Sequence, residues 1–262
     1  MGALAALAWQ AGAPPAAAPP AHIEGARPAG RPAAPARPAV LVGDAALRGE
    51  VDLARAVVRD GRYEVPLARG RRAVLTLDPA IQSAAEQVLD RAQPVRGAVV
   101  VLAPDGRILA LAGRGDGGRA DPSVALRAWA PAASVFKVVT AAALVRAGVD
   151  PAQRVCYHGG LRSVEAAHLR DDPNRDRECH DLAFAVARSQ NAIIAKLAHR
   201  FLDRARLADM AARLGFGARP ATALAAEIGT AELPAGGLEL ARVAAGFWHT
   251  RLSALGGALL AN

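Results

Sequence analysis

Proline spacing divides this chain into two regions of different folding capacity. Residues 10–40 are an Ala/Pro/Gly tract, and its prolines recur too often for a helix or a central strand to form. Nothing in the tract can fill a core, so we expect residues 1–40 to be a flexible linker. Residues 41–73 are predicted to precede the folded domain, with a short helix over residues 51–59, and the domain itself is predicted over residues 74–262.

The second region carries regular secondary-structure signals. Residues 74–77 are strand-like, and Asp78 followed by Pro79 is typical of a helix N-terminus. A hairpin is predicted from two apolar runs that flank a Pro-Asp-Gly turn at residues 104–106. Helical spacing predicts further helices at residues 134–148, 181–188, 192–202, 206–214 and 238–248. Residues 152–180 are predicted to be a polar loop. A strand, a helix, a hairpin and then a run of helices indicate a mixed α/β (α+β) chain.

The chain is basic because it is rich in arginine. Lys and Arg together number 32 against 24 Asp and Glu, yet Lys137 and Lys196 are the only lysines, so each of them needs a physical reason. The arginines are scattered and have few aromatic neighbours, which argues against nucleic-acid binding. No apolar run reaches the roughly 20 residues of a membrane-spanning helix. The short apolar start at residues 1–9 lacks the basic residues of a signal peptide, so a membrane tether would need a missing or truncated N-terminal segment.

Ser134-Val-Phe-Lys137 is the first motif that points to chemistry. Positions three apart share one helix face, so the lysine amine can reach the serine hydroxyl. Lysine accepts the serine proton only when it is neutral, a state that burial among apolar residues such as Phe136 and Val138 favours. A serine at a helix start also directs its N–H toward an incoming oxyanion. The alternative is a serine-capped helix with a surface lysine.

Ser189-Gln-Asn191 is a second motif, placed between two predicted helices. A hydroxyl at this point can relay a proton to a leaving amine, and the asparagine amide can hold both the lysine amine and a substrate carbonyl. Serine and asparagine are also common helix caps, which is the structural alternative. An S-x-x-K motif followed by an S-x-N motif is the combination found in penicillin-binding proteins and class A β-lactamases.

Five segments in this order resemble the transpeptidase domain of penicillin-binding proteins. They are LTLDPAIQSAAEQVLDRA, GAVVVLAPDGRILALAG, SVFKVVTAAAL, ARSQNAIIAKLA and RLGFG, and the late ELARVAAGFWHTRLSALGGALLA resembles a following helix. The resemblance runs from about residue 74 to residue 262. It implies the fold of penicillin-binding transpeptidases and serine β-lactamases, in which a helical cluster packs on a mostly antiparallel sheet.

The resemblance also implies a reaction and a place in the cell. In the family, the serine is acylated by the D-Ala-D-Ala end of a peptidoglycan stem peptide, or by a β-lactam, and the acyl group then passes to the amine of a neighbouring stem. Ser134 is then the nucleophile, Lys137 its base, Ser189 the proton relay, and Asn191 the residue that positions substrate and lysine. No cofactor is implied, and the implied location is the periplasm or cell envelope.

This chain departs from the family pattern at the third motif, Lys-Thr-Gly, because no lysine follows Lys196. His249-Thr-Arg251 does not replace it, since arginine stands where glycine is needed and the string falls in the predicted helix block. We therefore expect a domain that lacks its C-terminal strands, either a fragment or a degenerate relative, and inactive alone. The alternatives are a non-catalytic scaffold or sensor and a D,D-carboxypeptidase or β-lactamase. No acid after Asn191 has the Glu-x-x-Leu-Asn setting of a class A β-lactamase.

Two cysteines, Cys156 and Cys179, lie in the polar stretch together with His158 and His180. In a domain that acts on the cell wall, outside the cytoplasm, a disulfide is the favoured interpretation. Buried free thiols and a zinc site are the alternatives, although the Cys-x-His and Cys-His spacings are too tight for a usual finger. We therefore predict a disulfide and no metal.

Overall fold

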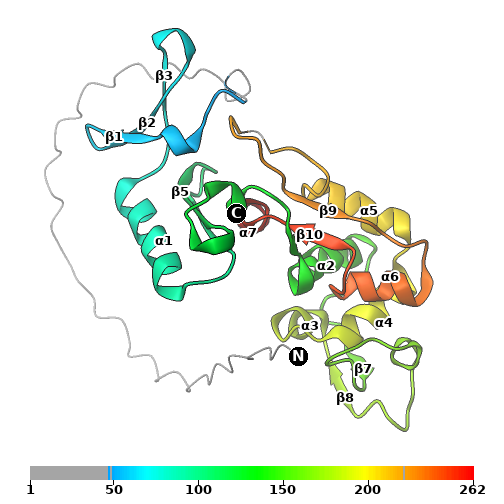
Figure 1. Cartoon of the computed structure of the whole chain (residues 1–262). Helices are drawn as coiled ribbons and strands as arrows, with labels where there is room; N and C mark the ends of the chain where they lie inside the picture. Colours follow the sequence, from blue (N-terminus) through cyan, green and yellow to red (C-terminus); the bar gives the residue numbers. More distant parts are fainter. Residues whose placement is uncertain (1–46, 48, 221) are drawn as a thin grey trace, which may run out of the picture. The chain divides into compact units, whose positions relative to one another are not determined.

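A computed structural model describes residue 47, residues 49–220 and residues 222–262, all in one compact unit (Figure 1). The predicted linker over residues 1–40 lies outside the described residues. The α-helices are α1 (Pro79–Ala92), α2 (Phe136–Arg146), α3 (Leu182–Ala187), α4 (Asn191–Phe201), α5 (Arg204–Arg213), α6 (Gly237–Ala244) and α7 (Ala254–Ala261). The strands are β1 (Val57–Arg59), β2 (Arg62–Pro66), β3 (Arg72–Val74), β4 (Gly97–Leu102), β5 (Ile108–Arg114), β6 (Ala130–Pro131), β7 (Val155–Tyr157), β8 (Glu178–His180), β9 (Gly229–Ala231) and β10 (Thr250–Leu252). Across these ranges no helix has the length and apolar character needed to cross a membrane.

All strand pairs in the described ranges are antiparallel. They form the sheets β1-β2-β3 and β6-β10-β9 and the pairs β4-β5 and β7-β8. Helices pack beside these strands, so the predicted fold class is confirmed. Within the described ranges, β4 pairs with β5 on one side and with no strand on the other.

The β4-β5 hairpin lies between two helices (Figure 1). Helix α1 begins as predicted, with Asp78 Oδ1 accepting from the backbone N–H of Ala80 at 2.9 Å. Its Ala85 and Leu89 pack with Ala110 and Ala112 of β5. On the other face of the hairpin, Leu111, Ala98 and Val100 pack with Leu255 of α7 and with Ala125. Alternate residues of a strand point to opposite sides. The hairpin therefore has two apolar faces, one covered by α1 and the other by α7.

The main core is helical and joins α2, α4 and α6. Residues 191–198 of α4 are all buried, so this helix is surrounded on every side. Phe136, at the start of α2, is fully buried and meets Phe216 edge to face at a ring-centroid distance of 5.3 Å. The N-termini of α2 and α4 are therefore held in this buried core.

The predicted helix over residues 51–59 is wrong. A 3-10 turn covers Leu53–Arg55, and β1 follows directly. Asp60 and Gly61 both have positive φ, 48° and 72°, which is the backbone of a two-residue type I′ hairpin turn. This turn and the β-branched Val57 and Val58 favour a hairpin over a helix.

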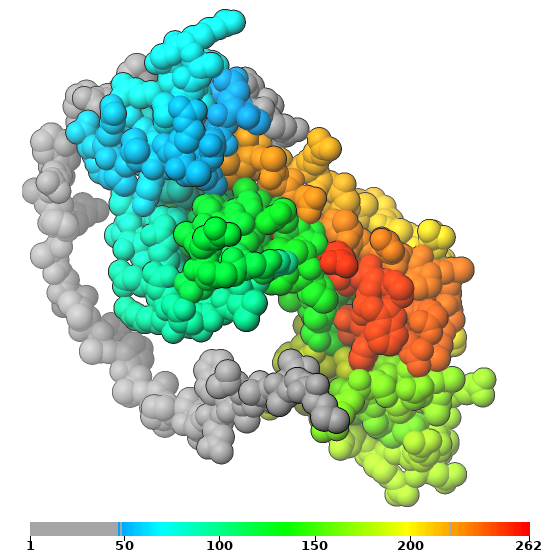
Figure 2. All heavy atoms as spheres, viewed as in Figure 1, coloured from blue at the N-terminus to red at the C-terminus, as the bar shows by residue number. Residues whose placement is uncertain are grey.

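Two other stretches differ from the predicted elements. The predicted polar loop contains β7 and β8, which pair with Cys156 opposite Cys179. The predicted helix over residues 238–248 ends at Ala244, because Gly246 has φ of 92°. The string His249-Thr-Arg251 therefore enters strand β10 and not a helix. Strand β10 pairs with β6. Figure 2 shows orange and red residues from the end of the chain beside green residues from its middle.

Candidate active site

Three polar groups from two distant segments converge at the start of α2. Ser134 lies in the short 3-10 helix Ala133–Val135 that runs into α2. Its Oγ lies 2.8 Å from Lys137 Nζ and accepts from Ser189 Oγ at 2.7 Å. Lys137 Nζ also lies 3.0 Å from Ser189 Oγ. The two serines and the lysine thus form a closed triangle, which the i, i+3 spacing predicted for Ser134 and Lys137.

Lys137 is buried, whereas the two hydroxyls it contacts are exposed. The lysine is 1% exposed, and within the described ranges no carboxylate pairs with it. Burial lowers the pKa of Lys137 from 10.5 to about 8, because the ammonium loses its solvation. At pH 7 about a tenth of the amines are then neutral, against roughly one in 3,000 at the ordinary value. The lysine can therefore take a proton from Ser134.

Gly246 packs against the backbone of Ala133 and Ser134, and the sequence did not reveal this contact. A Cβ at Gly246 would lie 2.4 Å from the carbonyl oxygen of Ala133 and 3.1 Å from Ser134 Cα. Thr140 Oγ1 donates to the carbonyl of Ala244 at 2.7 Å and fixes this end of α6 on α2. Ala133 itself has a left-handed backbone, with φ of 47°. The backbone of Ser134 is therefore seated against a position that only glycine can occupy without movement.

Replacement of Gly246 by alanine is expected to slow acylation of Ser134 at least about tenfold. The added Cβ displaces the Ala133 carbonyl, and small misplacements of a reacting group are costly. Gly236→Ala is the matched control, since Gly236 precedes the same helix, has no atom within 4 Å of its Cβ position, and has an extended φ of 168°. Rates are measured with a fluorescent penicillin, and equal rates for the two variants would contradict this prediction.

Asn191 is held by backbone carbonyls from another loop. Its Nδ2 donates to the carbonyl oxygens of Gly160 at 2.8 Å and Leu161 at 3.2 Å. Within the described ranges, Lys137 Nζ bonds to the two serines and not to Asn191. The expected direct contact between Asn191 and Lys137 is therefore not formed. The role of Asn191 toward substrate stays a prediction.

The sequence itself matches a family model. The Penicillin binding protein transpeptidase domain model aligns with residues 97–247, more than half of the chain. This chain belongs to that family. The aligned region contains the nucleophile candidate, the buried lysine and the Ser189-Gln-Asn191 motif.

Solved structures of penicillin-binding proteins share the fold. The ceftriaxone acyl-enzyme complex of penicillin-binding protein A from M. tuberculosis is 23% identical with a TM-score of 0.55, over 71% of this chain and 49% of that chain. PBP2 of Pseudomonas aeruginosa in complex with WCK 5153 is 23% identical with a TM-score of 0.54, over 71% and 49%. Penicillin-binding protein 2B of Streptococcus pneumoniae is 16% identical with a TM-score of 0.55, over 71% and 38%. This chain spans about half the length of these structures or less, and a comparison with curated proteins finds no match.

The cysteines of this penicillin-binding domain are bonded to each other. A disulfide joins Cys156 of β7 to Cys179 of β8, with their Cα atoms 3.9 Å apart. His180 stacks on Phe184 with ring centroids 3.6 Å apart, and His158 faces Asp176. Among the described residues, no group of three or more His, Cys, Asp or Glu side chains could hold a metal ion.

Removal of the disulfide is expected to lower the free energy of unfolding by roughly 3 kcal/mol, the loop-entropy value for a separation of 23 residues. Denaturant unfolding of the double variant Cys156→Ser, Cys179→Ser measures the change. Reduction of the unchanged protein should give the same shift, and the reductant should leave the double variant unaffected. Equal stability of the oxidised and reduced protein would contradict the prediction.

Proposed function

We propose that this domain forms an acyl-enzyme on Ser134 with the D-Ala-D-Ala end of peptidoglycan stem peptides, and with β-lactams, as a D,D-transpeptidase does. The observation that carries the proposal is the triangle of Ser134, Lys137 and Ser189, with a lysine that is buried and has no carboxylate partner in the described ranges. A nucleophile and a base in hydrogen-bond contact, with a third group beside them, are the arrangement that activates a serine. The proposed location is the cell envelope, where this substrate lies.

The first half-reaction uses each member of the triangle. Ser134 Oγ attacks the carbonyl carbon of the penultimate D-alanine while its proton passes to neutral Lys137. The amide C–N bond then breaks, and the leaving amine of the terminal D-alanine receives a proton through Ser189 Oγ. The products are an ester on Ser134 and free D-alanine. The backbone N–H of Ser134, in the first turn of a helix, has no intrahelical partner and is the proposed donor to the carbonyl oxygen.

The second half-reaction regenerates the serine. An amine of a neighbouring stem peptide attacks the ester carbonyl, Ser134 Oγ leaves, and the proton from the amine returns to Ser134 through Lys137. With a β-lactam, the leaving nitrogen stays tethered to the acyl group, so the ester remains on the serine. A β-lactam is therefore the most direct probe of the first half-reaction.

Labelling with a fluorescent penicillin tests the proposal. Trypsin cuts after Arg127 and Lys137, so the peptide of residues 128–137 contains Ser134 as its one serine. We expect one probe mass per chain, localised to this peptide. Absence of any covalent label, or a label only on other peptides, would refute an acyl-enzyme on Ser134.

Stem peptides separate the proposal from its rivals. Transfer to an added amine indicates a transpeptidase, release of D-alanine with water as acceptor indicates a carboxypeptidase, and binding without release indicates a scaffold. The sequence has no Lys-Thr-Gly motif after Lys196. We therefore expect this chain to be acylated once and to turn over little stem peptide.

A further inference from the structure

Lys196 is the second of the two lysines, and the proposed reaction does not use it. It lies on α4 with a fully buried side chain. Its Nζ donates to the carbonyl oxygen of Cys156 at 2.8 Å, to Asp176 Oδ2 at 2.8 Å and to Asp171 Oδ1 at 3.3 Å. These contacts use all three N–H groups of an ammonium. A buried charge is costly unless it is paired in this way, so the position has a specific reason for lysine.

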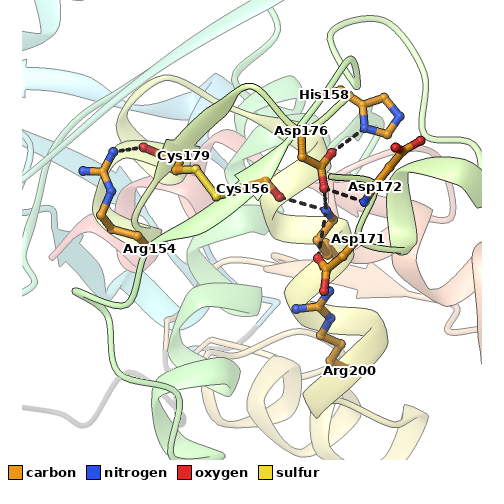
Figure 3. The surroundings of a disulfide bond; sticks show 9 residues. Arg154, Cys156, His158, Asp171, Asp172, Asp176, Cys179 and Arg200 are labelled. Carbon is orange, nitrogen blue, oxygen red and sulfur yellow. Dashed lines mark hydrogen bonds and ion pairs between the residues drawn. A yellow bond between two sulfur atoms is a disulfide. The ribbon is translucent and has the colours of Figure 1, made fainter. Parts of the chain in front are cut away.

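Asp176 connects Lys196 to a histidine. Its carboxylate is 4% exposed, and its Oδ1 lies 2.5 Å from His158 Nδ1, while Oδ2 accepts from Lys196 and from the backbone N–H of Asp172. Figure 3 shows Asp176 directed at the His158 ring, with the disulfide close by. Burial alone would raise the pKa of Asp176, but the hydrogen bonds from Lys196, Asp172 and His158 lower it to about 2. The carboxylate is therefore charged and accepts from both sides.

His158 begins the loop that holds Asn191. Gly160 and Leu161 follow it and supply the two carbonyl oxygens that accept from Asn191 Nδ2. Gly160 has φ of 76°, and a Cβ there would lie 2.6 Å from Ala192 Cβ, so this loop is packed directly on the first turn of α4. Helix α4 and the loop of residues 158–161 are thus joined at two levels, once through Asn191 and once through Lys196, Asp176 and His158.

We infer that Lys196 is a positioning residue for Asn191, acting through Asp176 and His158 on the carbonyls of Gly160 and Leu161. Ser189 belongs to the same short segment as Asn191, so the network also positions the Ser189 hydroxyl that contacts Ser134. Arginine would not replace Lys196, because its planar fork is larger and cannot direct three donors to three surrounding oxygens in a fully buried space. The inference rests on the proposed acylation of Ser134 and adds a residue that does not touch the substrate.

Lys196→Met tests the inference in the full chain with a fluorescent penicillin. We expect the acylation step of the folded protein to slow at least about tenfold, while the concentration of probe that gives half the maximal rate changes less than threefold. A double-mutant cycle compares Asn191→Ala with Asn191→Ala, Lys196→Met. The second substitution should slow acylation less than twofold further, because the amide that Lys196 positions is already absent. Arg200→Met is the matched control, since Arg200 lies on the same helix and also contacts Asp171, at 2.6 Å, but is partly exposed. Its acylation rate should stay within twofold of the unchanged protein.

A second variant and a second readout keep the inference testable. If Lys196→Met does not fold, His158→Phe removes the contact to Asp176 while the Lys196–Asp176 pair remains, and it should slow acylation similarly. The side-chain NH₂ signal of Asn191, assigned by its loss in Asn191→Ala, should exchange with solvent at least about tenfold faster in either variant. If the unchanged protein takes no label, the proposed function fails, and this exchange measurement alone decides the inference. Unchanged acylation or unchanged exchange in a folded variant would overturn the inference. Additive effects of Lys196→Met and Asn191→Ala on the acylation rate would overturn it as well.

Discussion

Ser134→Ala is expected to abolish covalent labelling by a fluorescent penicillin. Ser189 is the one rival nucleophile in the triangle, because its Oγ also lies 3.0 Å from Lys137 Nζ. Ser134 stands at a helix start, where backbone N–H groups and the positive end of the dipole stabilise an oxyanion. Ser189 lies outside any helix, between the C-cap of α3 and the N-cap of α4, so its own backbone N–H is not in a first helical turn. The geometry therefore favours attack by Ser134.

Ser189→Ala is the matched control for this experiment. It removes the other hydroxyl of the triangle, so we expect slower labelling, by roughly 10- to 100-fold, with the label still on the peptide of residues 128–137. Ser189 lies in the separate tryptic peptide of residues 189–196, which makes the two sites distinguishable by mass. A label on residues 189–196 of the Ser134→Ala variant would show that the roles of the two serines are reversed.

The parts of the site that the sequence predicted are those encoded over short distances. The spacing of Ser134 and Lys137 specifies their contact once a helix forms, and no distant residue is needed. Asp78 and Pro79 specify the start of α1 in the same local way. The contact of Ser189 with Ser134 bridges 55 residues, and only the resemblance to the family predicted it.

The parts that the sequence missed depend on tertiary contacts or on turn geometry. Nothing near Gly246 indicates that its missing Cβ leaves room for the Ala133 carbonyl, since that contact joins segments far apart in the chain. The pairing of β7 with β8 was hidden because both strands are short and lie in a polar stretch. The carbonyls of Gly160 and Leu161 carry no side-chain signal, although they fix Asn191.

Lys137→Arg is expected to slow acylation by at least about 100-fold. Arginine stays protonated in proteins, so it cannot accept the proton of Ser134, and general-base help is worth about that much. Its planar group also has a different shape from the amine, which is 1% exposed and has little room around it. Arg146→Lys, an exchange of the same two residue types in the last turn of α2, is the matched control and should leave the rate within twofold.

The pH dependence of acylation gives an independent test of the same role. The base must be neutral to act, and burial lowers the pKa of Lys137 to about 8, so the rate should rise with pH and level off above that value. Between pH 6 and pH 8 the neutral fraction grows roughly fiftyfold, and the acylation rate should follow it. In Lys137→Arg the remaining slow rate should lack this rise, since no group in the triangle then titrates in the range. A rate that is constant from pH 6 to pH 9 in the unchanged protein would mean that Lys137 orients Ser134 without taking its proton.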